Sequence, residues 1–332
     1  MPLSSVLQAF KSHGAKTAGP TRKVRVGLVG AGRMGQLHAR LLSENSGASF
    51  IGVSDSDPAR SKALAKRVRT QAIPQAEDLL GQVEAVVLAV PTAVHFLVGK
   101  MFLDAGVHCL IEKPLAATLP EAEALIRLAD ERRCVLQVGH IERFNPAVME
   151  AARHIQNPRF IEVNRLGPYD PRVAGTGVVM DLMIHDLDIV LFLVGQPVTR
   201  VEAFGAKVLS DHEDIAKVRL HFANGCIADL SASRISLKKY RTIRIFQKDA
   251  YLSLDYAKPQ LAVYRKKGPA IRSLSDIEYL KPKLSKKEPL ALELDHFLQC
   301  VREGKTPLVS GKHGRDALEL AREVLDHLRV HA

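Results

Sequence analysis

The sequence predicts an α/β protein with two sheets: a parallel sheet covered by helices and, after it, a larger, mostly antiparallel sheet. Between residues 24 and 140, short apolar runs alternate with amphipathic helical patterns, which is typical of a parallel sheet with helices on both faces. After Pro146, β-type runs follow one another and helical stretches are few. The chain has 332 residues, which is enough for two domains.

Five apolar runs in the first half are predicted as buried parallel strands. They are VRVGLVG at 24–30, SFIGVSD at 49–55, EAVVLAV at 84–90, VHCLIEK at 107–113 and CVLQVGH at 134–140. The helical patterns between them include LPEAEALIRLADERR at 119–133, with Pro120 near the first turn, where proline is tolerated. We assign residues 23–143 to this first domain. Residues 1–22 are predicted as a flexible extension that lacks the features of a secretory signal.

The second half, residues 144–332, is predicted as an α+β domain. Runs such as RFIEVNRLG, DIAKVRLHFA, CIADLSASRI and QLAVYRK indicate strands. Asn224-Gly225 lies between two of these runs and is a strong hairpin signal. Helices at about 181–194 and 290–303 are expected to cover one face of the sheet. Residues 258–287 carry nine Lys or Arg and two Asp or Glu, which favours a solvated loop or sheet edge over a phosphate-binding role.

Composition excludes some classes of protein and leaves others open. The 47 Lys and Arg against 36 Asp and Glu give a net charge of +11, which suits anionic small molecules, nucleic acid or acidic surfaces. No helix-turn-helix, zinc-finger or basic-zipper pattern supports binding to nucleic acid. No apolar run is long enough to span a bilayer, so no membrane partner is expected. The four cysteines have no metal-site spacing, and we expect reduced thiols, no bound metal and a cytoplasmic protein.

The first chemical motif is a glycine turn between a predicted strand and a predicted helix, in GLVGAGRMGQLHARLL. Such glycines allow the backbone to approach a pyrophosphate, and the start of the helix supplies unpaired N–H groups. The residues expected to contact a dinucleotide here are Gly30, Ala31, Gly32, Arg33, Met34 and Gly35. Asp55 ends the second strand, where a carboxylate accepts hydrogen bonds from an adenosine ribose. Ser56, not a cation, follows it, which favours NAD over NADP; Arg33 and Arg60 are the cations within reach of that corner.

Residues 177–195, GVVMDLMIHDLDIVLFLVG, read as a helix built for burial that nevertheless carries three carboxylates and a histidine in its first half. Asp181 and His185 are four residues apart, so a helix places both on one face, and Asp188 lies near the same stripe. We expect this polar stripe to face a cofactor cleft. For the other two carboxylates the pattern leaves open a solvent-facing Asp186 or an Asp188 paired with an arginine.

Further polar residues follow the predicted strand ends, where ligands bind in open parallel sheets. LIEKPLA places Glu112 and Lys113 at one strand end, and VPTAVHF places Thr92 and His95 after another. All four are predicted to border the cofactor. An ordinary helix cap by Thr92 and a partly exposed His95 are equally compatible with the pattern.

Two later strings supply candidate contacts to a substrate. They are GHIERFNPAV and NRLGPYDPRVAG, and the candidates are Arg143, Asn145, Arg165, Tyr169 and Arg172. Arginine suits a diphosphate because its guanidinium forms paired hydrogen bonds. An arginine that braces the domain junction and an ordinary surface loop remain alternatives.

The glycine turn, the EKP string, the GHIERFNP string and the Asp181–His185 helix together resemble the glucose–fructose oxidoreductase/inositol dehydrogenase (Gfo/Idh/MocA) family, over nearly the whole chain after residue 22. The resemblance implies an N-terminal Rossmann domain, which is a doubly wound parallel sheet, and a C-terminal α+β domain with a large open sheet. It implies hydride transfer between NAD(P) and a carbon bearing a sugar-like hydroxyl, with Lys113, Asp181 and His185 as the catalytic set. It also implies a homodimer or homotetramer that pairs through the sheet.

Within that family, VVMDLMIHDLDIVLFLV and FQKDAYLSLDY look most like the UDP-N-acetylglucosamine 3-dehydrogenases, which prepare a 3-amino sugar precursor for certain lipid A molecules. The implied chemistry fits the residues. A histidine titrates near neutral pH, so His185 can remove a hydroxyl proton, Asp181 can orient its ring, and Lys113 can stabilise negative charge on the oxygen. Two alternatives remain: a dehydrogenase of a free cyclitol or monosaccharide, and a non-catalytic, NAD-binding regulatory protein.

Overall fold

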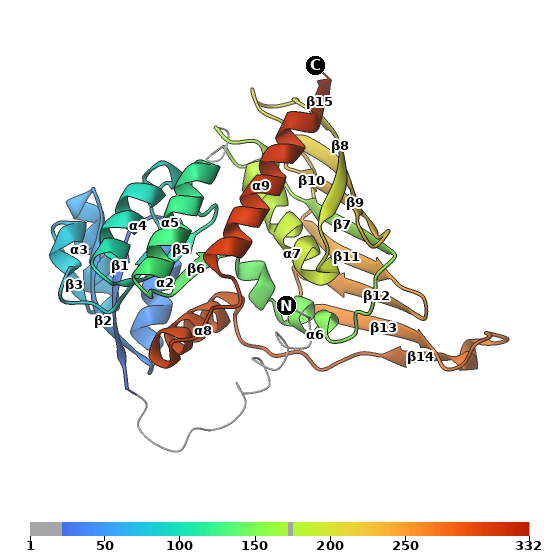
Figure 1. Cartoon of the computed structure of the whole chain (residues 1–332), viewed down its shortest axis with the longest axis horizontal. Coiled ribbons are helices and arrows are strands. Elements are labelled where there is room, and N and C mark those ends of the chain that lie inside the picture. Colours follow the sequence, from blue (N-terminus) through green and yellow to red (C-terminus); the bar gives the residue numbers. More distant parts are fainter. Residues whose placement is uncertain (1–21, 172–174, 332) are drawn as a thin grey trace. The chain divides into compact units, whose positions relative to one another are not determined.

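The computed structural model describes residues 22–171 and 175–331, and Figure 1 shows its elements. The chain divides into two compact units. The N-terminal unit comprises the described part of Ala15–Ile141 together with Glu288–Leu318. The C-terminal unit comprises Glu142–Lys287 together with the residues from Glu319 onward. The predicted N-terminal extension falls almost entirely on residues outside the described part of the chain.

Within the described residues, the N-terminal unit contains a six-stranded parallel sheet in the order β3-β2-β1-β4-β5-β6. The strands are β1 (Val24–Val29), β2 (Ala48–Ser54), β3 (Gln71–Ala72), β4 (Ala85–Leu88), β5 (His108–Glu112) and β6 (Leu136–Gly139). This is the order of a doubly wound nucleotide-binding sheet, so the predicted fold of this half is confirmed. The sequence predicted five of these strands and missed β3, which is too short to show a pattern.

Helices cover both faces of this sheet. The helices that connect its strands are α2 (Arg33–Glu44), α3 (Pro58–Val68), α4 (His95–Asp104) and α5 (Leu119–Glu131). Leu110 of β5 belongs to a core cluster that includes residues of α2 and α3. The next residue, Ile111, lies beside Gly99 of α4 and Leu125 of α5. Because neighbouring strand residues point to opposite faces, the two helix pairs lie on opposite sides of the sheet.

Helix α8 (Pro289–Glu303) corrects one expectation from the sequence. Its apolar residues Leu294 and Phe297 belong to the same core cluster as Val26 and Leu28 of β1. Helix α8 therefore completes the core of the parallel sheet, whereas we expected it to cover the antiparallel sheet. The apolar stripe of an amphipathic helix predicts that the helix is buried, but it does not say against which sheet.

The C-terminal unit contains, within the described residues, a nine-stranded sheet in the order β14-β13-β12-β11-β7-β10-β9-β8-β15. The strands are β7 (Phe160–Leu166), β8 (Val198–Ala206), β9 (Ile215–Phe222), β10 (Ile227–Ser233), β11 (Tyr240–Phe246), β12 (Ala250–Asp255), β13 (Gln260–Lys266), β14 (Ile277–Leu280) and β15 (Leu328–His331). Neighbouring strands pair antiparallel except β7 with β10 and β8 with β15. The predicted large, mostly antiparallel sheet is confirmed.

The hairpin and the sheet edge that the sequence predicts in this half are both present. Asn224-Gly225 lies in the β9–β10 hairpin, where Gly225 has a φ of +79° and the Asn224 side chain accepts a hydrogen bond from the Cys226 N–H. The basic stretch 258–287 includes β14, which is an edge strand of the sheet. Helices α6 (Pro146–Ala152) and α7 (Ile184–Val194) pack against the sheet, while α9 (Gly311–His327) leads into β15 (Figure 1).

Candidate functional site

The glycine turn joins β1 to α2 and depends on two of its three glycines for its shape. Gly30 has a φ of +102°, and a Cβ there would lie 2.3 Å from the Ala89 carbonyl oxygen. A Cβ on Gly35 would lie 1.9 Å from the carbonyl oxygen of Gly30. A Cβ on Gly32, by contrast, would have nothing within 4 Å. Because α2 begins with no side-chain cap, the turn leaves space and N–H groups for a phosphate at the start of the helix.

Asp55 lies against this turn. Its carboxylate accepts hydrogen bonds from the Ala31 N–H at 2.6 Å and from the Asp57 N–H at 2.8 Å. Arg60 pairs with Asp57 at 3.3 Å, and Arg33 is an exposed residue of α2. The carboxylate thus follows β2 at the edge of the sheet where the glycine turn follows β1, which is the arrangement that a ribose of NAD requires.

Lys113 follows β5 at the same edge and is half-buried between two buried residues. On one side, Glu112 lies 2.8 Å from Nε2 of His38, which is fully buried in α2. On the other side, Pro114 offers its carbonyl oxygen to Nδ1 of His95 at 2.8 Å. The chain on both sides of Lys113 is therefore held by buried histidines.

His95 is not the partly exposed residue that the sequence left open as an alternative. It is 1% exposed, and its two ring nitrogens lie 2.8 Å from the Pro114 carbonyl oxygen and 2.9 Å from the Val90 carbonyl oxygen. The ring therefore connects the segment after β4 to the segment after β5, rather than standing partly exposed. Thr92 belongs to the segment after β4 and is half-buried in a short 3-10 turn formed by Thr92–Val94.

Glu293 of α8 is a buried carboxyl group that the sequence analysis did not single out. It is 0% exposed, and among the described residues neither of its carboxylate oxygens has a hydrogen-bond partner. Burial, and then the nearby Glu112 carboxylate, raise the pKa of Glu293 well above its usual value. The fold therefore favours the protonated form of Glu293, near Glu112 at the end of β5. Because glutamate in an amphipathic helix usually faces solvent, no pattern in the sequence predicts that Glu293 is buried.

Asp181 and His185 lie at the junction between a π-helical turn (Val179–Met183) and α7. Both are half-buried, while Ile184 and Asp186 beside His185 are buried. A π-helical turn inserts one additional residue into a helix and is frequent at functional sites. The sequence predicted one regular helix over 181–194, and periodicity alone did not reveal the wider turn.

The other two carboxylates of this helix form buried ion pairs. Asp188 accepts two hydrogen bonds of 2.7 Å from Arg143. Asp186 accepts two from Arg165, at 2.8 and 2.9 Å, and one from the Tyr256 hydroxyl at 2.7 Å. The predicted pairing of Asp188 is confirmed, and the suggested solvent-facing Asp186 is wrong because this residue is 1% exposed. Burial opposes the charge on Arg165, but Asp186 and its other anionic neighbours hold the pKa of the guanidinium well above its usual value.

The predicted substrate contacts therefore have partners inside the C-terminal unit. Arg143 and Arg165 are 2% and 3% exposed and bind Asp188 and Asp186 as described. Asn145 caps α6 through its side-chain oxygen and donates to the Tyr256 carbonyl oxygen at 3.0 Å. Tyr169 is half-buried, with the Arg234 guanidinium 5.6 Å from the centre of its ring. Arg172 lies outside the described residues.

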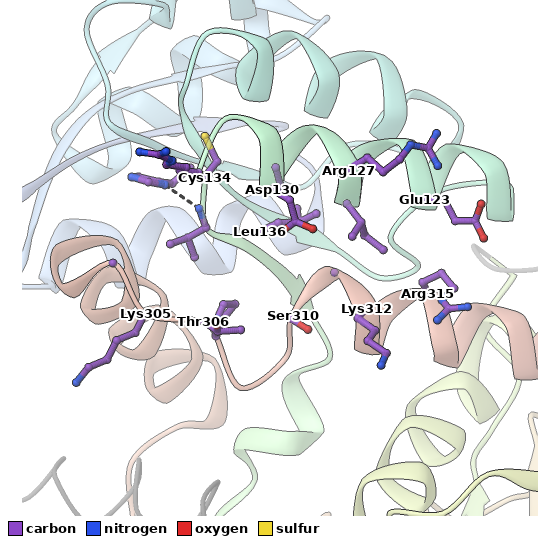
Figure 2. Close-up of a pocket in the computed structure, with 18 residues that line it drawn as sticks. Glu123, Arg127, Asp130, Cys134, Leu136, Lys305, Thr306, Ser310, Lys312 and Arg315 are labelled. Carbon is purple, nitrogen blue, oxygen red and sulfur yellow. Dashed lines mark hydrogen bonds between the residues drawn. The ribbon is translucent and has the colours of Figure 1, made fainter. Parts of the chain in front are cut away.

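A cavity of about 670 Å³ lies elsewhere in the N-terminal unit (Figure 2). It is bordered by α5, by the segment before α9 and by the starts of β5 and β6. Its charged residues include both signs: Glu123, Arg127 and Asp130 come from α5, and Lys312 and Arg315 come from α9 (Figure 2). Ligands of open parallel sheets bind at the opposite ends of the strands, where the glycine turn lies, so we do not assign this cavity to the reaction.

Two features are absent from the described part of the chain. In residues 22–171 and 175–331, no group of three or more His, Cys, Asp or Glu side chains is arranged to hold a metal ion. No helix in those residues is long and apolar enough to cross a membrane.

Known proteins resemble this chain over both units. Residues 24–140 match the family described as "Oxidoreductase family, NAD-binding Rossmann fold", and residues 149–253 match the "GFO/IDH/MocA C-terminal domain". The UDP-N-acetylglucosamine 3-dehydrogenase of Acidithiobacillus ferrooxidans is 36% identical over 302 residues, which cover 91% of this chain and 96% of that protein. The inositol 2-dehydrogenase of Rhizobium meliloti is 30% identical, over 90% of this chain and 94% of that protein.

Solved structures agree with these sequence matches. The structure of UDP-N-acetylglucosamine 3-dehydrogenase GnnA from Acidithiobacillus ferrooxidans superposes with a TM-score of 0.87 at 35% identity, covering 92% of this chain and 97% of that one. Levoglucosan dehydrogenase in complex with NADH and levoglucosan superposes with a TM-score of 0.82 at 20% identity, over 92% of this chain and 97% of that one. The second likeness, at its low identity, shows the fold alone.

Proposed function

We propose that this chain, which belongs to the GFO/IDH/MocA family of NAD-binding oxidoreductases, uses NAD to oxidise the C3 hydroxyl of UDP-N-acetylglucosamine. The observation that carries the choice of substrate is the 36% identity to a UDP-N-acetylglucosamine 3-dehydrogenase over 91% of the chain, which spans both units. The net charge of +11 is compatible with a substrate that carries a diphosphate.

The residues of the glycine turn fit NAD. The open space at Gly32 and the uncapped start of α2 suit the pyrophosphate, and Asp55 suits the adenosine ribose. When bound, the nicotinamide accepts the hydride that leaves the sugar carbon. Arg60, a cation that an NADP phosphate would attract, is paired with Asp57, which supports NAD as the cofactor.

We assign the proton chemistry to the implied catalytic set. His185 takes the proton of the sugar hydroxyl, because an imidazole exchanges protons near neutral pH. Asp181 orients that ring and stabilises it after protonation. Lys113 donates a hydrogen bond to the hydroxyl oxygen and stabilises its developing negative charge. All three residues are half-buried, and Lys113 and His185 each lie between two buried neighbours, which supports these roles.

Incubation of the purified chain with NAD and UDP-N-acetylglucosamine tests the proposal, with reduced nicotinamide followed by its absorbance. A coupled aminotransferase that consumes the keto sugar keeps the reaction moving forward. We expect reduction of NAD with UDP-N-acetylglucosamine and little with free N-acetylglucosamine. If NAD binds but no nucleotide sugar supports its reduction, the proposed substrate is wrong.

The variants Lys113→Met and His185→Asn test the assigned roles. Each should lower kcat by about 100-fold or more, because general acid–base catalysis typically contributes that much. The double variant should be little worse than either single variant, because groups that act on one step are not additive. Binding of NAD, measured by titration, should remain. Additive losses in the double variant would show that the two residues serve separate steps.

A free cyclitol is the second candidate substrate, and a specific observation favours it. The inositol 2-dehydrogenase of Rhizobium meliloti is 30% identical over 90% of the chain. The two candidates differ in the nucleotide, so a panel that compares myo-inositol with UDP-N-acetylglucosamine separates them. Turnover of inositol alone would replace our first choice of substrate and leave the assigned proton chemistry unchanged.

We further propose that a second copy of the chain covers the open face of the nine-stranded sheet. Aromatic rings cross this face from strand to strand, with centroid separations of 4.9 to 5.9 Å, and they are Phe160, Phe246, Tyr251, Tyr264 and Tyr279. Tyr264 and Tyr279 are 39% and 55% exposed. The same face carries pairs of both signs, such as Arg219 with Asp229, so it is compatible with a copy of itself.

Light scattering tests this pairing. The wild type should be a dimer or tetramer, and Tyr264→Lys should lower the subunit number while the isolated subunit stays folded. A monomeric wild type would contradict it. Four free cysteines, three of them buried, also support a reducing, cytoplasmic location.

A further inference from the structure

The turn that carries Asp181 is held from outside by one carboxylate. The Glu213 side chain accepts a hydrogen bond from the Val179 N–H at 3.1 Å, and the Glu213 carbonyl oxygen accepts one from the Val178 N–H at 3.0 Å. Glu213 is 7% exposed and Val179 is fully buried. The first N–H groups of a helical segment lack partners within the helix, so a buried carboxylate there is a strong substitute.

Gly177 makes this approach possible. A Cβ on Gly177 would lie 1.9 Å from Oε1 and 2.1 Å from Oε2 of Glu213. The carboxylate therefore occupies the volume that any other side chain would need. Gly177 also offers its carbonyl oxygen to the Asp181 N–H at 3.1 Å. The contact thus joins Glu213, through one glycine, to the residue that we assign to catalysis.

The segment that carries Glu213 is itself fixed. The neighbouring Asp214 is 0% exposed and accepts hydrogen bonds from the Val208, Leu209 and Ser210 N–H groups at 2.6 to 3.0 Å. Arg234 donates to Asp214 at 2.6 Å and to the Thr176 carbonyl oxygen at 2.6 Å. Burial alone would raise the pKa of Asp214, but these donors hold it well below its usual value, so the group stays charged.

We propose that Glu213 is a positioning residue: by holding the π-helical turn Val179–Met183 it fixes the orientation of Asp181 relative to His185, and Gly177 is required because only glycine admits the Glu213 carboxylate. A π-helical turn carries one residue more than a regular turn and is less stable. Its conversion to a regular turn rotates the preceding residues by about 100° around the helix axis. Such a rotation changes the direction of the Asp181 side chain relative to the ring of His185. This inference rests on the proposed roles of Asp181 and His185.

The structure offers a matched control for the glycine. A Cβ on Gly175, two residues earlier, would have nothing within 4 Å. Gly177→Ala should displace the carboxylate of Glu213, whereas Gly175→Ala should leave it in place. We therefore expect kcat to fall by about 10-fold or more in Gly177→Ala, as is typical when a group that orients a functional residue is lost. The KM for NAD should not change, because the glycine turn is untouched, and Gly175→Ala should behave as the wild type.

Two conservative variants of Glu213 separate positioning from mere stability. Glu213→Gln keeps the length and the accepting oxygen, and should keep most of kcat. Glu213→Asp keeps the charge but is one methylene shorter, and should lose kcat as Gly177→Ala does. Asp211→Ala, at an exposed residue of the same segment, is the control. Full kcat in Glu213→Asp, or equal losses in Glu213→Gln and Glu213→Asp, would overturn the proposal.

A double variant and a measurement without substrate complete the test. Gly177→Ala with Glu213→Ala should be no worse than either alone, because both remove the same contact; multiplied losses would overturn the proposal. Amide hydrogen exchange at Val179 should accelerate in Gly177→Ala and not in Gly175→Ala. This readout stands even if the wild type oxidises no sugar, in which case the proposed function fails and the exchange result alone decides whether Glu213 holds the turn.

Discussion

The buried ion pair between Arg143 and Asp188 offers a direct test of why an apolar helix carries carboxylates. Asp188→Asn removes the charge and keeps the size of the side chain. The Arg143 guanidinium is then left without its counter-charge at 2% exposure, above the ring of Phe192 at 4.8 Å. A buried charge without its partner is costly because protein solvates it poorly.

The expected loss is large for a single substitution. Removal of one partner of a buried pair typically costs about 3–5 kcal/mol, and this pair has two hydrogen bonds of 2.7 Å between groups that are 2% and 1% exposed. For a unit of this size, that corresponds to a drop in melting temperature of roughly 10 °C. Replacement of both residues, Arg143→Met with Asp188→Leu, should recover most of the stability, because no buried charge remains.

The chain contains a matched control for this experiment. Arg219 and Asp229 on the open sheet face form the same paired contact, with two hydrogen bonds of 2.7 Å, but their side chains are 51% and 32% exposed. Asp229→Asn should therefore change the melting temperature much less, since water solvates the remaining arginine. Scanning calorimetry or urea unfolding measures both variants. Equal losses at the two sites would refute the reasoning from burial, and a stable Asp188→Asn with weakened sugar binding would instead make Arg143 a substrate contact.

Two further predictions concern the N-terminal unit. Gly32→Ala should leave the melting temperature unchanged but weaken NAD binding, because its Cβ enters only the space kept for the cofactor. Gly35→Ala should lower both the melting temperature and the affinity for NAD, because its Cβ meets the Gly30 carbonyl oxygen. Thermal unfolding and NAD titration separate the two variants, and normal NAD binding by Gly32→Ala would contradict the prediction. As pH rises from about 5 to about 8, the free energy of unfolding of Glu293→Gln, measured in urea, should increase relative to that of the wild type. Because the pKa of Glu293 is raised in the fold, the folded wild type binds more protons than the unfolded chain over this range. The contribution of Glu293 to wild-type stability therefore falls as pH rises, whereas the neutral glutamine does not respond to pH. A constant difference in stability between the two proteins would show that Glu293 is not the titrating group.

Most strands and the glycine turn of the N-terminal unit could be predicted from the sequence because the patterns that indicate them are local. The glycine turn needs a strand before it and a helix after it, and both are adjacent in the chain. Asp55 and Lys113 directly follow apolar strands, and parallel strands bring their carboxyl ends to one edge of the sheet. The hairpin at Asn224-Gly225 is local in the same sense. Such features require no knowledge of which distant segments meet.

The features that the sequence did not reveal are long-range. Asp186 is 21 residues from Arg165 and Asp188 is 45 residues from Arg143, and nothing in the local pattern selects these partners. Helix α8 packs against a sheet that ends about 150 residues earlier in the chain, although its apolar stripe suits either sheet equally. The Glu213 contact with Gly177 belongs to this class as well. Its only trace in the sequence is a glycine just before an apolar helix.

These long-range pairs explain why α7 can present His185 in one direction. The helix is apolar on nearly every side, so hydrophobic burial alone holds it weakly against rotation about its axis. Asp186 lies about 100° from His185 on one side of the helix, and Asp188 lies about 60° away on the other. Each is locked to an arginine that belongs to a different element, Arg165 in β7 and Arg143 before α6. A rotation by one residue breaks both buried pairs at once. The carboxylates that seemed out of place in an apolar helix therefore fix its rotation, and the face that remains is the one that carries Asp181 and His185.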